Sequence, residues 1–213
     1  MVNLSVHSSD LVSQEVLTRH YAIERITHVV QTAWGHILSS VLPCVPSDAP
    51  LTRLPTDTKH LSALKLPYYP TIKWDKFVRD DEKLGHQKHG DKQIAIDLYI
   101  TDFNEARELN QKSRGKDYPT NILSYPSDLP QAVQELMEEL PLGELVVCHD
   151  VIDRQAQEQG KTVDDHLTHL LVHGLLHLLG FDHELGQYEQ EQMENLEIEI
   201  LARLNVANPY END

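Results

Sequence analysis

The chain has 213 residues, of which 40% are hydrophobic, and it carries a formal net charge of −16. This length suits one domain with a substantial core. We expect no membrane association, because no apolar run is long enough to span a bilayer and residues 1–7 lack a signal-peptide pattern. Two separated cysteines, Cys44 and Cys148, exclude a disulfide framework, so we expect a reduced, cytoplasmic protein.

The negative charge is concentrated in the C-terminal half of the chain. Residues 1–116 hold 15 Lys and Arg against 14 Asp and Glu, whereas residues 117–213 hold 3 against 20. A strongly acidic protein is ordinarily a poor partner for nucleic acid. Because the first half is balanced, an anionic substrate is still compatible with this chain if it approaches from the N-terminal elements.

The N-terminal part predicts a strand, a helix and then an insertion. Residues 2–7 alternate weakly, which predicts a short strand, and residues 13–37 carry apolar side chains at helical spacing. Residues of about 39–92 hold six of the eleven prolines and nine of the eighteen Lys and Arg, so we expect a loop-rich insertion. Two interpretations are open for it: a solvated surface excursion, or an accessory contact with RNA or the ribosome.

Strands and helices interleave after this segment. The pattern predicts strands over 93–101, 121–125 and 142–148, the last of them central. It predicts helices over 103–112 with Asp102 as the cap, then over 131–140, 151–159, 163–179 and 187–204. This order favours a layered α/β or α+β domain with a small sheet.

The run HGLLHLLGFDH at residues 173–183 predicts a metal site. His173 and His177 are four residues apart, so on a helix they project from one face. Gly180 can take a positive φ and end the helix, which lets His183 complete a three-nitrogen set. Three imidazoles with an open fourth position are typical of catalytic zinc, whereas structural zinc sites are usually closed and rich in Cys.

The form HxxxHxxGxxH matches the pattern of metzincin zinc peptidases except at one position. Those peptidases carry Glu directly after the first His as a general base, and here that residue is Gly174. Glycine can neither accept nor deliver a proton. The metal geometry is therefore preserved, whereas the peptidase chemistry lacks its base.

A second cluster of functional side chains lies upstream of the histidines. Lys112, Arg114 and Lys116 stand within five residues at a predicted helix end. They can form a positive spot of phosphate size, in which Arg clamps two oxygens. The alternative is a solvated turn, but beside a hydrolytic metal site the charge suits phosphoryl chemistry.

Together these two motifs resemble the YbeY family of bacterial single-strand endoribonucleases. Residues 114–126, RGKDYPTNILSYP, and residues 173–183 carry the resemblance, with support from the strand at 142–148 and the Glu-rich C-terminal helix. The resemblance implies an α+β fold with a small mixed sheet packed with helices. It implies a single metal-dependent hydrolase domain over residues 1–213, with the insertion at about 39–92 as the main departure.

The resemblance also implies the activity and its residues. One zinc ion would be held by His173, His177 and His183, in a metzincin-like arrangement on a helix and the following turn, and Arg114 would contact phosphate. The expected substrate is single-stranded RNA, in 16S rRNA 3′-end maturation and 70S ribosome quality control, with the ribosome or ribosomal proteins as partners. Two alternatives stay open: a zinc metallopeptidase, and a non-enzymatic ribosome-assembly factor with a structural metal.

Overall fold

The computed structural model describes residues 2–41, 93–130, 133 and 136–211. Within these ranges it has four strands, β1 (Val2–Ser8), β2 (Gln93–Thr101), β3 (Ile122–Pro126) and β4 (Glu139–Cys148). Six helices accompany them: α1 (Gln14–His20), α2 (Ile23–Val41), α3 (Phe103–Arg114), α5 (His149–Glu158), α6 (Val163–Leu178) and α7 (Gln187–Arg203). None of the helices in these ranges has both the length and the apolar character needed to cross a membrane.

The four strands form one mixed sheet in the order β1-β2-β4-β3. β1 is parallel to β2 and β2 is parallel to β4, whereas β3 runs antiparallel to β4. The prediction of an α+β fold with a small mixed sheet is confirmed for these residues. Strand β4 lies between β2 and β3, so the prediction that this strand is central is also confirmed.

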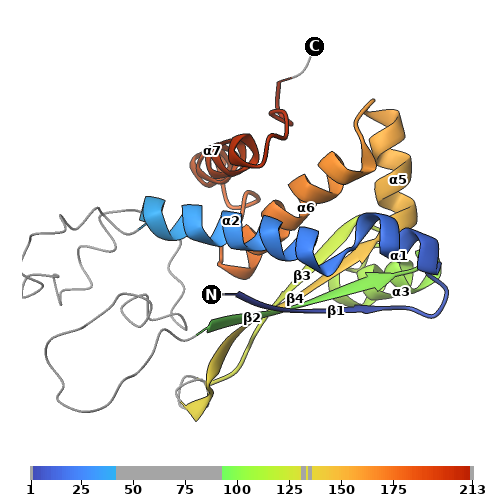
Figure 1. Ribbon diagram of the computed structural model, residues 1–213, viewed down its shortest axis with the longest axis horizontal. Coiled ribbons are helices and arrows are strands. Elements are labelled where there is room, and N and C mark those ends of the chain that lie inside the picture. Colours follow the sequence, from blue (N-terminus) through green and yellow to red (C-terminus); the bar gives the residue numbers. More distant parts are fainter. Residues whose placement is uncertain (1, 42–92, 131–132, 134–135, 212–213) are drawn as a thin grey trace, which may run out of the picture.

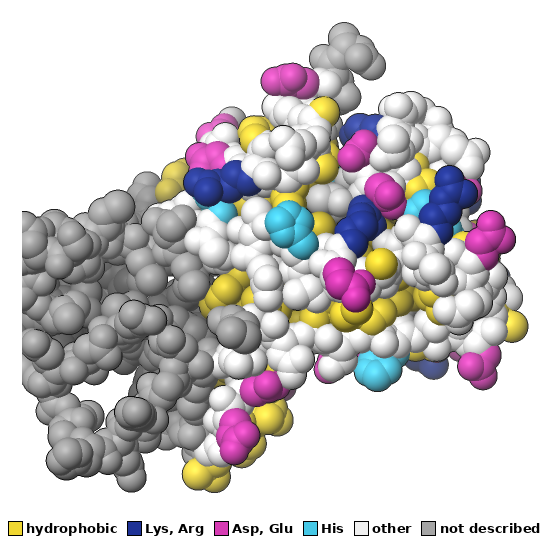
Figure 2. Space-filling view, in the orientation of Figure 1, with side chains coloured by type: hydrophobic (Ala, Val, Ile, Leu, Met, Phe, Trp, Pro, Cys, Tyr) yellow, Lys and Arg dark blue, Asp and Glu magenta, His cyan; other side chains and the backbone are white. Residues whose placement is uncertain are grey.

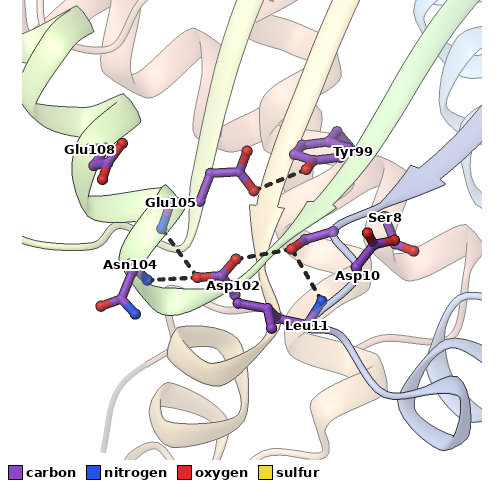
Figure 3. A pocket seen from close by; sticks show the side chains of 9 residues that line it. Ser8, Asp10, Leu11, Tyr99, Asp102, Asn104, Glu105 and Glu108 are labelled. Atoms are coloured by element: carbon purple, nitrogen blue, oxygen red, sulfur yellow. Dashed lines mark hydrogen bonds between the residues drawn. The ribbon is translucent and has the colours of Figure 1, made fainter.

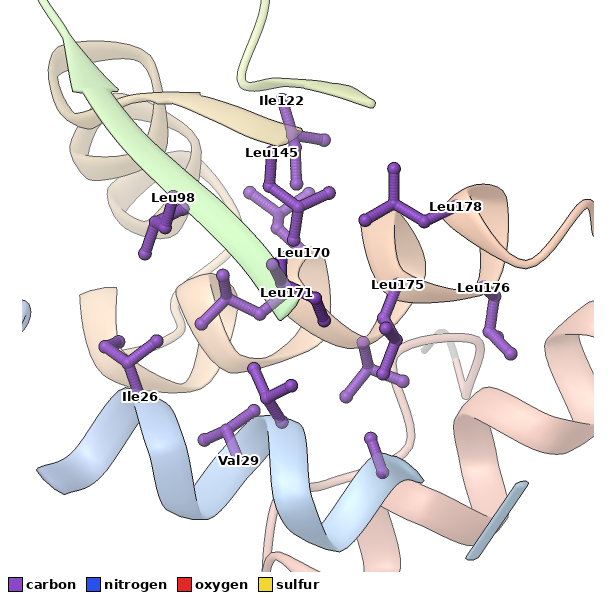
Figure 4. Packing of buried hydrophobic residues seen from close by; sticks show 14 of the residues in the cluster. Ile26, Val29, Leu98, Ile122, Leu145, Leu170, Leu171, Leu175, Leu176 and Leu178 are labelled. Atoms are coloured by element: carbon purple, nitrogen blue, oxygen red, sulfur yellow. The ribbon is translucent and has the colours of Figure 1, made fainter. Parts of the chain in front are cut away.

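The core lies on one face of the sheet. Ile94, Ile96, Leu98 and Ile100 of β2 alternate along the strand and are all buried, because successive side chains point to opposite faces. Helix α2 packs on β1, α6 packs on β3 and β4, and the two helices contact each other (Figures 1 and 4). Full burial of one such side chain stabilises the fold by about 1.5–3 kcal/mol, so this face fixes where α6 lies.

The opposite face is covered mainly by α3. Cys148 lies on the other side of β4 from Val147 and packs with Ala106 of α3 and with Val151. Asp97, in the middle of β2, is exposed. Buried and more exposed side chains therefore alternate along β2, because only the face of the sheet that carries the core is fully covered.

Two predicted helices differ from the structure. The helix predicted over 13–37 is broken between α1 and α2 at Tyr21, which is buried and caps α1. The helix predicted over 131–140 is wrong at its end, because Glu139 and Leu140 pair with Gln93 and Ile94 in the sheet. Cross-strand hydrogen bonds to β2 outweigh the weak helical pattern there.

Some of the predicted segments cannot be compared with the structure. Residues 131–132 and 134–135 lie outside the described residues, as does the predicted insertion apart from its first three positions, 39–41. The proposed RNA or ribosome contact of that insertion therefore stays a prediction. Helix α2 extends to Val41, four residues beyond the predicted end.

Candidate metal centre

The turn after α6 folds the chain back against the C-terminal end of that helix. Gly180 has a φ of 91°, a conformation that favours glycine. Its N–H donates to the carbonyl of His177 at 2.9 Å, and the N–H of Phe181 donates to that of Leu176 at 3.0 Å, which is the Schellman pattern of helix termination. The reversal places His183 beside the helix that it follows.

The structure brings the three predicted ligands together. One nitrogen from each of His173, His177 and His183 lies within 4.8 Å of the other two. The rings of His173 and His177 are 4.6 Å apart, and each lies 5.3 Å from the ring of His183. Such a compact triangle of half-buried imidazoles can hold a metal ion.

The protonation of His177 suits this role. Burial lowers the pKa of this imidazole, and the neighbouring His173 and His183 lower it further, to about 4. Desolvation and like charges both oppose the protonated form. His177 is therefore neutral near pH 7, with a lone pair available for a ligand bond.

A buried carboxylate, Glu197 of α7, accepts hydrogen bonds from two histidines of α6. It is 0% exposed, and it accepts hydrogen bonds from His169 Nε2 and His173 Nδ1, both at 2.9 Å. The hydroxyl of Tyr210 donates to the same carboxylate. Burial by itself raises the pKa of Glu197, but the bonds from His169 and His173 outweigh it and lower the pKa to about 2, so the group is ionised at neutral pH.

This hydrogen bond fixes the tautomer of His173. Because Nδ1 donates to Glu197, the lone pair belongs to Nε2, which lies 3.1 Å from Nε2 of His177. A histidine held in this way is typical of metal ligands, so the donor set fits a metal ion. Glu197 was not among the residues predicted from the sequence, although its position on the apolar stripe between Met193 and Leu201 was a usable signal.

Gly174 faces the sheet, where it has no room for a side chain. A Cβ added there would lie 2.7 Å from Ile122 Cδ1 and 2.8 Å from Leu145 Cδ2. The hydroxyl of Ser124 also donates to the Gly174 carbonyl at 3.3 Å. The residue that replaces the peptidase glutamate is therefore a packing contact between α6 and β3–β4.

Substituting Gly174→Glu is expected to lower the free energy of unfolding by more than about 3 kcal/mol, since it overpacks the core and buries an unpaired carboxylate. Gly174→Ala should cost less, because the two methyl groups can move and Ala favours a helix by about 1 kcal/mol. Urea denaturation of both variants measures the difference. Equal stabilities of wild type and Gly174→Glu would contradict this packing.

Arg114 is the last residue of α3, and its side chain is exposed. Its neighbours form ion pairs of their own: Asp117 accepts two hydrogen bonds from Arg107, at 2.7 and 2.8 Å. Arg114 is not among the residues that line the cavity beside the histidines. On the face shown in Figure 2, Lys and Arg side chains lie singly among acidic ones, without a continuous basic patch.

A cavity of about 620 Å³ adjoins the candidate metal centre. Its wall includes His173 and His169 of α6, together with residues of α5 and of the segment after α7. Polar side chains dominate this wall. The full lining is Asn121, Gln155, Glu158, Gln159, Lys161, His166, His169, Leu170, His173, Pro209 and Tyr210.

A second, shallower depression lies where β1 and β2 end (Figure 3). Two of its carboxylates, Asp102 and Glu105, are already used by the fold. Asp102 accepts from the backbone N–H groups of Asn104 and Glu105 and from the hydroxyl of Ser9, and Glu105 accepts from the hydroxyl of Tyr99. This depression is accounted for by the N-terminal cap of α3, as the sequence predicted for Asp102.

Fold and site together define an α+β protein with a three-histidine centre able to hold a metal ion. A family model described as Endoribonuclease YbeY matches residues 70–205. The match begins inside the predicted insertion and extends almost to the end of the chain. The chain belongs to the endoribonuclease YbeY family.

Similar proteins carry the same name. An Endoribonuclease YbeY from Psychrobacter cryohalolentis is 60% identical over 154 residues, which cover 72% of this chain and 92% of that protein. One from Psychrobacter arcticus is 58% identical over 147 residues, 69% of this chain and 66% of that protein. The solution structure of TM1509 from Thermotoga maritima aligns with 100% of this chain and 97% of its own, with a TM-score of 0.43 and 17% identity.

Proposed function

We propose that this protein is a zinc-dependent endoribonuclease specific for single strands, with one ion held by His173, His177 and His183. The observation that carries the proposal is the convergence of the three imidazoles within 4.8 Å. The buried carboxylate behind His173 adds to it. The resulting arrangement, two ligands on a helix and the third on the following turn, is the metzincin-like geometry that we assign to the site.

When bound by these three histidines, a zinc ion would supply a Lewis acid that could polarise the scissile phosphate and lower the pKa of bound water to about 7. The residues of the chain supply the rest. The fixed tautomer of His173 leaves a lone pair on its Nε2, and neutral His177 also has one unprotonated ring nitrogen. Glu197 holds the proton on His173 Nδ1, and its negative charge would stabilise positive charge on that ring when a metal is bound.

Arg114 is the residue that we assign to the substrate phosphate, since a guanidinium neutralises non-bridging oxygens with two parallel hydrogen bonds. Arg114→Glu is expected to lower kcat/KM for RNA by about 10²-fold or more, the scale seen when one charge-stabilising donor is removed. Its zinc content should stay at the wild-type level. Loss of zinc in parallel with activity would make Arg114 a structural residue instead.

We propose that the biological substrate is ribosomal RNA, in 16S rRNA 3′-end maturation and 70S ribosome quality control in the cytoplasm. Relatives at 58% and 60% identity are named Endoribonuclease YbeY, which supports RNA as the class of substrate. The ribosome or ribosomal proteins are the corresponding partners. We propose one domain for residues 1–213, in which the segment of about 39–92 is an insertion.

Both alternatives to this function are weaker. A peptidase of this geometry needs a general base after the first histidine, and the space at Gly174 is filled by Ile122 and Leu145. A non-enzymatic assembly factor with a structural metal does not need a three-ligand site with an open position. Turnover of RNA by the metal-loaded protein distinguishes an enzyme from this factor.

The test is metal-dependent cleavage by the full chain. Protein stripped with a chelator should not cut a labelled RNA oligonucleotide, and one equivalent of Zn²⁺ should restore cleavage. The same oligonucleotide annealed to its complement should resist cleavage. Equal cleavage by the stripped and the zinc-restored protein, or equal cleavage of the single strand and the duplex, would contradict the proposal.

A further inference from the structure

The cavity beside the histidines contains a chain of hydrogen bonds that begins at a backbone group. The N–H of Ile122 donates to Oδ1 of Asn121 at 2.8 Å, which fixes the orientation of the Asn121 amide. Its Nδ2 then donates to Oε1 of Gln155 at 3.0 Å. The Gln155 amide is oriented in turn, with its oxygen toward Asn121.

His166 completes the network around the same oxygen. Its Nε2 lies 3.0 Å from Gln155 Oε1, and because that atom is an acceptor, Nε2 must donate. The other nitrogen, Nδ1, is buried and meets no hydrogen-bond partner among the described residues, so the proton belongs on Nε2. Burial, assisted by His169 and Lys161, lowers the pKa of His166 to about 4, which keeps the ring neutral.

The network leaves the amide nitrogen of Gln155 available to a ligand in the cavity. An amide oxygen has two lone pairs, and here Asn121 and His166 occupy both. The amide nitrogen Nε2 carries two N–H donors, and it has no hydrogen-bond partner in the described part of the chain. Gln155 lines the cavity, so this side chain offers a fixed donor and no acceptor.

The remaining wall suits a flat, polar ligand close to the metal centre. His173, a candidate zinc ligand, lines the same cavity as Gln155. Tyr210 also lines it and is 38% exposed as a residue, while its hydroxyl donates a hydrogen bond to Glu197. Aromatic rings next to single-stranded RNA commonly stack on bases, and a volume of about 620 Å³ is within the range of small-ligand sites.

We propose that this cavity binds the base of a nucleotide adjacent to the cleaved phosphodiester, and that Gln155 Nε2 selects a base with a carbonyl acceptor over adenine. The inference rests on the proposed ribonuclease function and adds a specificity-determining residue to it. Uracil, cytosine and guanine each present a carbonyl oxygen to a donor. Adenine pairs best with an amide that offers donor and acceptor together, and the Gln155 acceptor is already occupied.

The binding of nucleoside 5′-monophosphates to the full-length, zinc-loaded protein tests this subsite by calorimetry. UMP should bind at least about fivefold more tightly than AMP, the scale of one hydrogen bond. Ribose 5-phosphate measures the contribution of sugar and phosphate alone, and it should bind more weakly than UMP.

Gln155→Glu replaces the donor by an acceptor and keeps an oxygen for Asn121 and His166. It should lower the UMP-to-AMP affinity ratio to one or below, because the carboxylate accepts from the amino group of adenine. Gln157→Glu is the matched control, since it adds the same charge to an exposed position on α5. That variant should retain the wild-type ratio.

Three outcomes would overturn the subsite: equal affinities for UMP and AMP, equal affinities for UMP and ribose 5-phosphate, or an unchanged ratio in Gln155→Glu. The cleavage assay is read separately. A protein that binds UMP selectively but never cuts RNA would refute the ribonuclease proposal and leave the subsite. A protein that cuts RNA without this selectivity would refute the subsite alone.

Discussion

His177→Ala is expected to abolish both zinc binding and RNA cleavage. The substitution leaves only two of the three candidate ligands. Removing a residue that only hydrogen-bonds to a metal ligand already costs about 10- to 100-fold in affinity or activity, and the loss of a ligand itself should cost more. The loss of cleavage should therefore exceed about 100-fold. Helix α6 should persist, because Ala has the highest helix propensity. The measurements are zinc per chain by atomic spectroscopy and cleavage of single-stranded RNA.

His28→Ala provides the matched control for this prediction. His28 is an exposed residue of α2, and its removal should change neither zinc content nor cleavage. Equal cutting by wild type and His177→Ala would mean that a contaminating nuclease, or a site elsewhere in the chain, produces the activity. Because ribonucleases are common contaminants, all three proteins need parallel purification.

Glu197→Gln is expected to weaken zinc binding by about 10- to 100-fold, the usual effect of losing a carboxylate behind a histidine ligand. The amide keeps the size of the side chain but removes the charge that holds the proton on His173 Nδ1. Titration of the zinc-free protein in competition with a chelator measures the dissociation constant. Cobalt substitution adds a second readout, because the visible spectrum reports ligand geometry.

Glu191→Gln, an exposed change of the same charge on α7, should leave the zinc affinity unchanged. Far-UV circular dichroism of the zinc-free proteins checks that Glu197→Gln retains its helices. If this variant is folded and binds zinc as tightly as wild type, the carboxylate serves only to pack α7 against α6. In that case the fixed tautomer of His173 would have no influence on the metal.

The three histidines could be predicted because their spacing is a local property. His173, His177 and Gly180 depend only on helix periodicity and on the conformations open to glycine. Glu197 lies 24 residues after the histidine that it holds. Its contact depends on how α7 packs across α6, which no spacing within one segment encodes.

The same distinction applies to the fold. The alternation over residues 93–101 predicted a strand, and β2 is that strand, with alternate side chains buried. The order β1-β2-β4-β3 depends on pairings between distant segments. The break at Tyr21 was also missed, because the burial of that ring between elements outweighs a helical pattern that runs through it.

The close contact at Gly174 has a consequence for how a metal ion would enter and leave. Because Gly174 has no side chain, Ile122 of β3 and Leu145 of β4 pack directly against the backbone of α6, so a shift of the helix segment that carries His173 and His177 would disturb the core. His183 stands on a turn outside this contact. The candidate site thus combines two histidines on a packed helix with a third on a turn, and we expect a bound ion to be released more readily from His183 than from the other two.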